Sequence, residues 1–368
     1  MKAAAFHVGV AMALEARGFS FRGGIIGEGQ SPKVRTDSNK AKISTYVGSS
    51  AGSLVATFLA QGGNLKDLEA SFFENSPTGA IPAMKYWEMI FPRIKGKSDL
   101  FSFDNFFIKM LRLRTLQSPF STQGISRYLK SHVIKSDRFS ELESDLFVVA
   151  TEVNQSRKTI FGKYLAAPSN PQIEYRNDVA ISDACASSMA FPPIYHPYSI
   201  QIDGVRRDYF DGEIREPLSS HIARDVGADL IICSYTHQPL RIHPSKGSLS
   251  DRGIQQVFLQ AIYQSIEQKI QSSRGYRDRE KALIDFVKKF FIQNGLGSQL
   301  CDKLVEELEA RMTYKSNVDY IYIRPRPTDD EMFTLAHFSL NKAVTEKIAR
   351  KGYLAAMIAT HHIKTERS

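Results

Sequence analysis

The stretch ISTYVGSSAGSLVATFLAQ, residues 43–61, decides the fold. Its first residues, ISTYV, are rich in β-branched and aromatic side chains, so they predict a short strand over 43–47. The mostly apolar AGSLVATFLAQ predicts a buried helix over 51–61. The pentapeptide between them, GSSAG, matches G-x-S-x-G, a turn that places a nucleophilic serine between a strand and a helix.

Ser50 is the central residue of this motif and the candidate nucleophile. Gly48 and Gly52 let the strand and the helix approach closely, and Ala51 begins the helix. The Ser50 hydroxyl then lies at the helix N-terminus, where the macrodipole stabilises developing negative charge. Ser49 is the rival, but it lacks glycines two residues before and after it. The alternative structural interpretation is a Gly-rich turn in which Ser50 only caps the helix.

A serine nucleophile needs a base that takes its proton, and residues 203–213, DGVRRDYFDGE, contain a candidate. Asp211 follows a short apolar strand end and precedes Gly212, so its carboxylate can reach across from a strand tip. Asp203 competes for the role, but Asp203-Gly204 is typical of a polar hairpin turn.

A Ser-His-Asp triad is the alternative arrangement of the same chemistry. In the chain order serine, acid, histidine, the candidates are His237 and His337. Neither histidine lies in a distinctive motif. A triad would make the protein a different serine hydrolase, such as a thioesterase.

Apolar strands alternate with helices along the rest of the chain, which favours an α/β fold with a mostly parallel sheet covered on both faces. Further strands are predicted at 146–153, 207–210, 229–234 and 319–323, and further helices at 3–17, 178–189, 217–226, 253–312 and 340–362. We expect a single domain with its core at about 1–62, 141–239 and 316–368, and with helical insertions at about 63–140 and 240–315.

Composition limits the classes of protein that remain. The 368 residues are 42% hydrophobic, yet no apolar run is long enough for a transmembrane helix. A net charge of +9 attracts anionic partners, either nucleic acid or an anionic membrane surface, and no nucleic-acid motif is present. The alternative is a basic surface with no such partner. The cysteines are widely spaced, form no metal-ligand pattern and suggest reduced thiols in the cytoplasm; they are Cys185, Cys233 and Cys301. The oligomeric state is left open.

Four blocks together resemble the patatin-like phospholipase family. They are KAAAFHVGVAMALEARG (2–18), YVGSSAGSLVA (46–56), AISDACASSMAFPPIYHPYSIQIDGVRRDYFDG (180–212) and EPLSSHIARDVGADLIICS (216–234). Their order and spacing agree with the family pattern. The resemblance implies a three-layer α/β/α fold whose central sheet lies between helices.

The resemblance also implies a chemistry. In the family, a Ser-Asp dyad hydrolyses acyl esters of phospholipids or other lipids through an acyl-enzyme, and the aspartate acts as base without a histidine. These roles fall on Ser50 and Asp211. The implied activity is of the phospholipase A or lysophospholipase type, with no metal or other cofactor, in the cytoplasm or at a membrane surface.

This chain departs from the family at the base. At this position the family pattern is Asp-Gly-Gly or Asp-Gly-Ala, whereas this chain has Asp211-Gly212-Glu213. A carboxylate two residues from the base either raises its pKa by like-charge repulsion or points to solvent. We expect Glu213 to point to solvent.

A second departure lies at the oxyanion loop, which in the family reads Gly-Gly-Gly-x-Arg/Lys before the first helix. Met1-Lys2 match only the last two positions, which leaves Lys2 and Ala3 as the remnant of that loop. We expect the glycines and the preceding strand upstream of Met1 in a longer protein, which in-frame upstream codons would support. A catalytically weak homologue that binds lipid or a protein partner is therefore an alternative.

Residues 85–114 combine aromatic and basic side chains, including Trp87 and Phe91. Aromatic rings suit the headgroup layer of a bilayer, and lysine and arginine suit anionic lipids. The alternative is an ordinary helical cap whose phenylalanines pack on the core.

Overall fold

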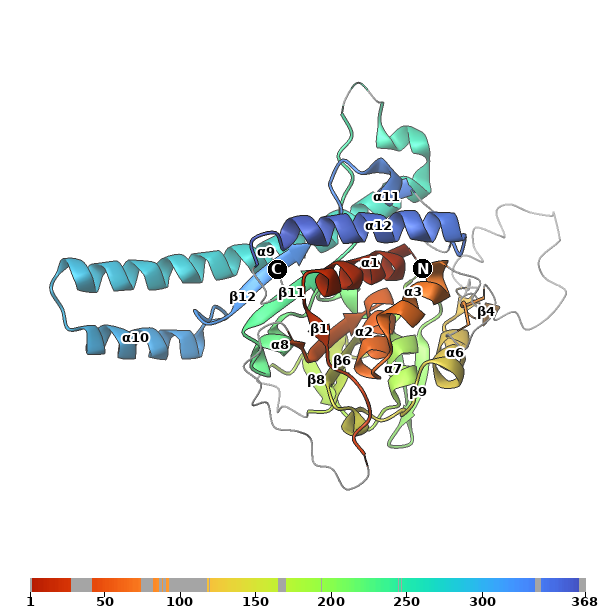
Figure 1. The fold of residues 1–368 in the computed structure, drawn as a ribbon, viewed down its shortest axis with the longest axis horizontal. Helices are drawn as coiled ribbons and strands as arrows, with labels where there is room; N and C mark the ends of the chain where they lie inside the picture. The colour runs from red at the N-terminus through yellow and green to blue at the C-terminus, as the bar shows by residue number, and fades with distance from the viewer. Residues whose placement is uncertain are drawn as a thin grey trace.

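The computed structural model describes residues 2–27, 42–73, 82–85, 88, 91–92, 118, 120–164, 170–192, 194–243, 245, 247–334 and 339–363. Met1, His337 and most of 85–114 lie outside these ranges. Helices surround a central sheet (Figure 1), which confirms the predicted α/β class.

The central sheet is organised around β6 (Asp145–Glu152), which is buried along its whole length. Its neighbours are β3 (Thr45–Ser49), β7 (Arg157–Gly162) and β10 (Val205–Asp211), and the outer strands are β8 (Ile173–Arg176) and β9 (Tyr198–Ile202). β3 pairs with the first half of β6, where Ser49 is the partner of Val149. β10 pairs with the second half, where Asp211 is the partner of Ala150. The two strand ends that carry the candidate residues therefore meet at adjacent positions of β6.

The prediction of a mostly parallel sheet is wrong, because strand directions are mixed. β3–β6 and β7–β8 are parallel, whereas β6–β7, β6–β10 and β9–β10 are antiparallel. The sequence pattern missed β7 and β8 and gave no bounds for β9, and β7 and β9 belong to hairpins. Asp203 and Gly204 form the β9–β10 turn, with φ of 52° and 74°, so the hairpin turn predicted there is confirmed. Such short connections force neighbouring strands to run antiparallel.

Side chains of β6 alternate between two faces of the sheet, as strand geometry requires. Leu146, Val148 and Ala150 pack with α2 (Ala51–Ala60) and α7 (Ile181–Ser188). Phe147 and Val149 pack instead with α8 (His221–Asp225). Helices therefore cover both faces, which gives the expected three layers.

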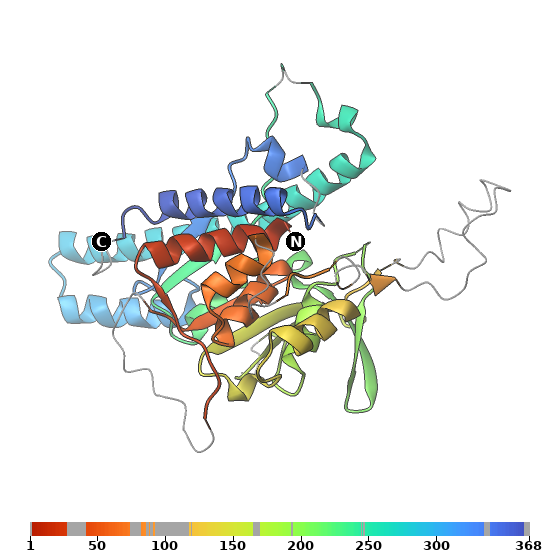
Figure 2. The same ribbon diagram turned by 45° about the vertical axis from the view of Figure 1, so that its right-hand side comes forward.

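α1 (Lys2–Ala16) and α12 (Lys342–Ala359) lie side by side at the edge of this core (Figures 1 and 2). They approach very closely at two glycines. A Cβ atom on Gly9 would lie 1.8 Å from the Ala349 carbonyl oxygen, and one on Gly352 would lie 2.1 Å from the Phe6 carbonyl oxygen. Together the helices cover a separate parallel pair of strands, β11 (Leu230–Ser234) and β12 (Asp319–Ile323).

α9 (Ile254–Gln293) and α10 (Ser298–Arg311) form an arm that extends from the body (Figures 1 and 2). The predicted helical segment 253–312 is thus two helices, separated by a turn in which Gly295 has φ of 64°. The arm has a small core of its own around Ile284, Cys301 and Val305.

The remaining elements are short and connect these parts. They are β1 (Ser20–Phe21), β2 (Lys42–Ile43), α3 (Leu65–Phe73), β4 (Phe91–Pro92), β5 (Phe120–Ser121), α6 (Gln123–His132) and α11 (Asp330–Thr334). Within the described ranges, no helix combines the length and the apolar character needed to cross a bilayer.

Candidate active site

Ser50 occupies a sharp turn between β3 and α2. Its backbone has φ 51° and ψ −133°, a conformation that is unfavourable for a residue with a side chain and that concentrates at functional sites. Gly48 is required by the close packing of this turn, because a Cβ atom there would lie 2.5 Å from Cα of Ser53. The Ser53 hydroxyl donates a hydrogen bond of 2.6 Å to the Ser50 carbonyl oxygen and closes the turn.

A second serine fixes the turn to the sheet. The backbone N–H of Ser50 donates to Oγ of Ser188, at 2.8 Å, and the Ser188 hydroxyl donates to the Val149 carbonyl oxygen, at 2.6 Å. Ser188 is the last residue of α7 and was not singled out from the sequence as a site residue. The only signal was its place in the Ala-Ser-Ser segment of the family-like block.

Asp211 ends β10 and is fully buried. Gly212 permits this position, because a Cβ atom there would lie 2.4 Å from the Val149 carbonyl oxygen and 3.0 Å from Oγ of Ser49. One carboxylate oxygen of Asp211, Oδ1, accepts the backbone N–H of Glu213 at 3.0 Å. The other, Oδ2, is buried and has no partner with ordinary hydrogen-bond geometry among the described residues.

The pKa of Asp211 is raised to about 7, mainly by burial and also by the neighbouring charge of Glu213, while a hydrogen bond from the Ser50 side chain acts to lower it. The Ser50 hydroxyl is therefore close to the carboxylate, although their approach is looser than an ordinary hydrogen bond. Such loose contacts are common in sites without substrate. A carboxyl group with a pKa near neutral pH suits general-base chemistry.

Glu213 does not point to solvent, which corrects our expectation. Its side chain is 16% exposed, and Oε2 lies 2.5 Å from Nδ1 of His237, whose side chain is 15% exposed. The protonated imidazole of His237 would balance the charge of Glu213 and allow this carboxylate inside the protein. His237 was a candidate from the sequence, and the structure brings it into the site on the loop after β11.

Two residues of α1 complete the polar surroundings. His7 Nδ1 lies 2.8 Å from the hydroxyl of Ser234, and burial lowers the pKa of His7 to about 4. Lys2 donates a 2.6 Å hydrogen bond to the Met332 carbonyl oxygen, and burial lowers its pKa to about 7. Nothing in the sequence distinguished His7 or Ser234. Lys2 interacts electrostatically with His237. The predicted role of Lys2 in an oxyanion loop stays a prediction.

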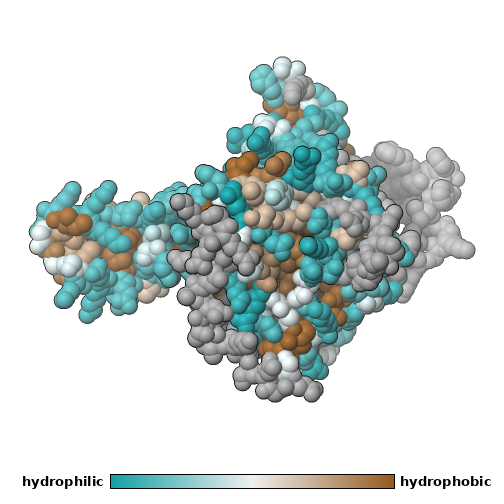
Figure 3. All heavy atoms as spheres, in the orientation of Figure 1, coloured by the Kyte–Doolittle hydropathy of each residue, from teal (hydrophilic) through white to brown (hydrophobic). Residues whose placement is uncertain are grey.

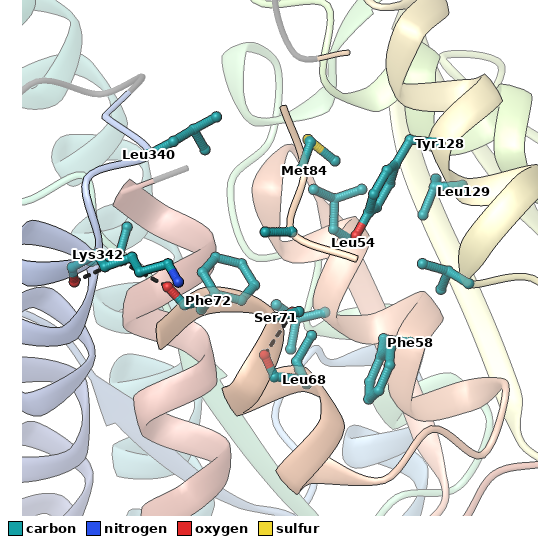
Figure 4. A pocket seen from close by; sticks show the side chains of 14 residues that line it. Leu54, Phe58, Leu68, Ser71, Phe72, Met84, Tyr128, Leu129, Leu340 and Lys342 are labelled. Carbon is teal, nitrogen blue, oxygen red and sulfur yellow. Dashed lines mark hydrogen bonds between the residues drawn. The ribbon is translucent and has the colours of Figure 1, made fainter. Parts of the chain in front are cut away.

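A cleft of about 1020 Å³ opens beside the turn and separates β3 from β11. Polar groups line the end of the cleft next to the turn, and they come from His7, Ser49, Gly52, Glu213 and Ser234. A smaller pocket of about 70 Å³ lies along α2 (Figure 4). Its walls are mostly apolar and include Leu54, Phe58, Phe72, Tyr128 and Leu129.

Comparison with protein-family models shows which family the chain belongs to. The family model for patatin-like phospholipase matches residues 1–223, more than half of the 368 residues. The chain belongs to the patatin-like phospholipase family. A search among curated proteins found no match.

Patatin-like proteins are generally esterases and phospholipases, so the chain belongs to a family of lipid acyl hydrolases. The patatin-like match contains Ser50, Asp211 and Glu213, whereas His237 and the arm lie beyond it. No group of three or more histidine, cysteine, aspartate or glutamate side chains in the described ranges is arranged as a metal site. The site therefore consists of a patatin-like serine turn and aspartate, with additional polar residues from outside the matched region.

Proposed function

We propose that the protein hydrolyses fatty-acyl esters of phospholipids or related lipids, with Ser50 as nucleophile and Asp211 as general base. The observation that carries the proposal is the meeting of β3 and β10 on adjacent positions of β6, Val149 and Ala150. This register brings the strained serine turn and the buried carboxylate together. The family membership supports the same chemistry.

In the proposed first step, Oγ of Ser50 attacks the carbonyl carbon of the ester while Asp211 takes the hydroxyl proton. The first N–H groups of α2, on Ala51 and Gly52, lack intrahelical acceptors and favour the developing oxyanion. When the C–O bond breaks, protonated Asp211 returns its proton to the leaving alcohol. Water then attacks the acyl-enzyme, again with Asp211 as base, and releases the fatty acid and free Ser50.

The surroundings of the turn suit an amphiphilic substrate. The pocket along α2 begins one helical turn after Ser50, at Leu54, and its apolar walls suit part of an acyl chain (Figure 4). The larger cleft is lined by both polar and apolar side chains, with the polar groups of His7, Glu213 and Ser234 among those near the turn. A lipid ester combines a polar ester region with an apolar tail, so a polar cleft beside an apolar pocket suits it.

A fluorophosphonate probe tests the nucleophile, because it forms a covalent adduct with activated serines. We expect one adduct, mapped by peptide mass to Ser50, with labelling lost in Ser50→Ala and in Asp211→Asn. Ser49→Ala is the matched control, since Ser49 is the neighbouring serine in the same turn. Labelling that persists in Ser50→Ala would contradict the proposal.

A histidine base is the alternative that one contact favours, because His237 lies within the site. In that arrangement His237→Gln would abolish labelling of Ser50, and Asp211→Asn would leave part of it. A binding protein without catalysis would give no adduct in any variant. The proposed dyad requires the opposite pattern, in which Asp211→Asn abolishes labelling and His237→Gln does not.

We also propose that the protein works at an anionic lipid surface. The predicted contact stretch, 85–114, lies mostly outside the described residues and stays a prediction. The arm supports the proposal, because Phe286, Ile292 and Leu300 are 64%, 79% and 62% exposed. Figure 3 shows apolar patches among hydrophilic surface on the arm. The exposed cations of the arm include Lys288, Lys289 and Lys303. Apolar side chains beside cations suit insertion between anionic headgroups.

The test uses vesicles with about 30% anionic lipid. The triple variant Phe286→Ser, Ile292→Ser and Leu300→Ser is expected to bind them roughly tenfold more weakly, because it loses apolar contact with the bilayer. Vesicle co-sedimentation measures this. The control is Leu354→Ser with Ile358→Ser, which changes exposed apolar residues of α12. If the triple variant instead dissociates a dimer in analytical ultracentrifugation and binds vesicles normally, the arm joins two copies of the chain.

A further inference from the structure

We propose that Glu213 and His237 form an electrostatic pair that sets the lower pH limit at which Asp211 acts as a base. The inference rests on the proposed Ser50–Asp211 hydrolase. The family pattern accounts for neither residue. Glu213 departs from the pattern, and His237 lies beyond the residues that match the family. Neither contacts the ester in the proposed mechanism, so both are positioning residues.

The geometry links the pair directly to the base. The backbone N–H of Glu213 donates to Oδ1 of Asp211 at 3.0 Å, so Glu213 cannot move away without breaking this hydrogen bond. The side chain of Glu213 turns to His237, where the two charged groups are 2.5 Å apart and largely shielded from water. A carboxylate, a second carboxylate and an imidazole therefore follow one another from Asp211 to His237.

The position of His237 is fixed from the other side by aromatic packing. Tyr263 of α9 meets the imidazole edge-to-face, with ring centroids 5.0 Å apart and an interplanar angle of 87°. Phe333 of α11 packs against Tyr263 in turn, at 5.7 Å and 88°. These contacts hold the imidazole beside Glu213, so the counter-charge stays in place when the active site is empty.

The two members of the pair act on Asp211 in opposite directions. The charge of Glu213 raises the pKa of Asp211, and that of His237 lowers it. Burial lowers the pKa of His237, but the charge and hydrogen bond of Glu213 oppose burial, and the net direction of the shift is upward, which favours the protonated imidazole. The other titratable groups whose electrostatic interactions reach this cluster are His7, Lys2 and Tyr263, and Asp329 acts on Lys2.

Single substitutions should therefore move the pH dependence in opposite directions. A general base works only when ionised, so activity rises as pH passes through the pKa of Asp211, about 7. Glu213→Gln removes the like charge, lowers the pKa of Asp211 and shifts the acidic limb down by roughly half a pH unit, because the same variant also weakens the opposing charge of His237. His237→Gln removes the cation and leaves the Glu213 charge, so it raises the pKa of Asp211 and shifts the limb up by roughly one pH unit.

The experiment measures kcat/KM for a soluble acyl ester from about pH 5 to pH 9 in the full chain. Variants are Glu213→Gln, His237→Gln and the double variant, in which the two shifts should partly cancel. Opposite shifts support the inference, because loss of structure alone would lower the rate without moving the limb in two directions. Shifts of the same sign, or no shift in either variant, overturn it.

A second readout separates this inference from the proposed function. Histidine-selective NMR titration of the full chain follows His237 directly, with His237→Gln assigning its signal. Glu213→Gln is expected to lower the pKa of His237, since its counter-charge is lost. If that pKa does not fall, the pair does not exist as proposed. If it falls but the probe never labels Ser50, the pair stands as an electrostatic unit and the hydrolase proposal fails.

Discussion

Asp211→Asn is expected to lower hydrolysis of a soluble acyl ester by roughly a thousand- to ten-thousandfold. The asparagine amide has nearly the same shape as the carboxylate, but it cannot take the proton of Ser50. Its oxygen can still accept the backbone N–H of Glu213, as Oδ1 does in the parent chain. The substitution should therefore remove the base while the turn at Gly212 keeps its geometry.

Steady-state kcat/KM measures this effect, and thermal unfolding checks that the variant remains folded. Asp208→Asn is the matched control, because it makes the same change three residues earlier on β10, where Oδ1 of Asp208 accepts from Ser199 and Arg206. The control should stay within a few-fold of the parent chain. A folded Asp211→Asn enzyme with nearly full activity would exclude Asp211 as the base.

Gly9→Ala is expected to destabilise the fold by about 3 kcal/mol, since overpacking at a close contact forces neighbouring backbone apart. The added Cβ would lie 1.8 Å from the Ala349 carbonyl oxygen. This oxygen belongs to helix backbone, so it cannot rotate away as a side chain could. α1 and α12 would have to separate. That separation would also disturb the β11–β12 pair, which packs on both helices.

Denaturant unfolding measures the free energy of unfolding for this variant. Gly275→Ala is the control, because Gly275 also lies inside a helix, α9, but no atom lies within 4 Å of its added Cβ. There alanine should stabilise the protein by about 0.5–1 kcal/mol through its higher helix propensity. If both variants changed stability equally, close packing of α1 against α12 would not explain the need for glycine.

Local sequence patterns predicted the elements that carry the candidate nucleophile. The apolar stretch after GSSAG predicted a helix at 51–61, and α2 spans Ala51–Ala60. The strand predicted at 319–323 coincides with β12. These predictions succeeded because burial periodicity and turn residues are properties of neighbouring positions. The outer strand β8 was missed because it is only partly buried and its four residues give no apolar run.

The sequence by itself determined the α/β class, the strand–turn–helix around Ser50 and the choice of Asp211 as a candidate base, because each depends on residues close together in the chain. Tertiary structure alone decided the mixed strand directions and the environment of Glu213. His237 lies 24 residues after Glu213 and reaches it only because β11 and its following loop fold against α1 and α9. Charge pairing acts through space, so the partner of a buried carboxylate follows from the packing of whole elements.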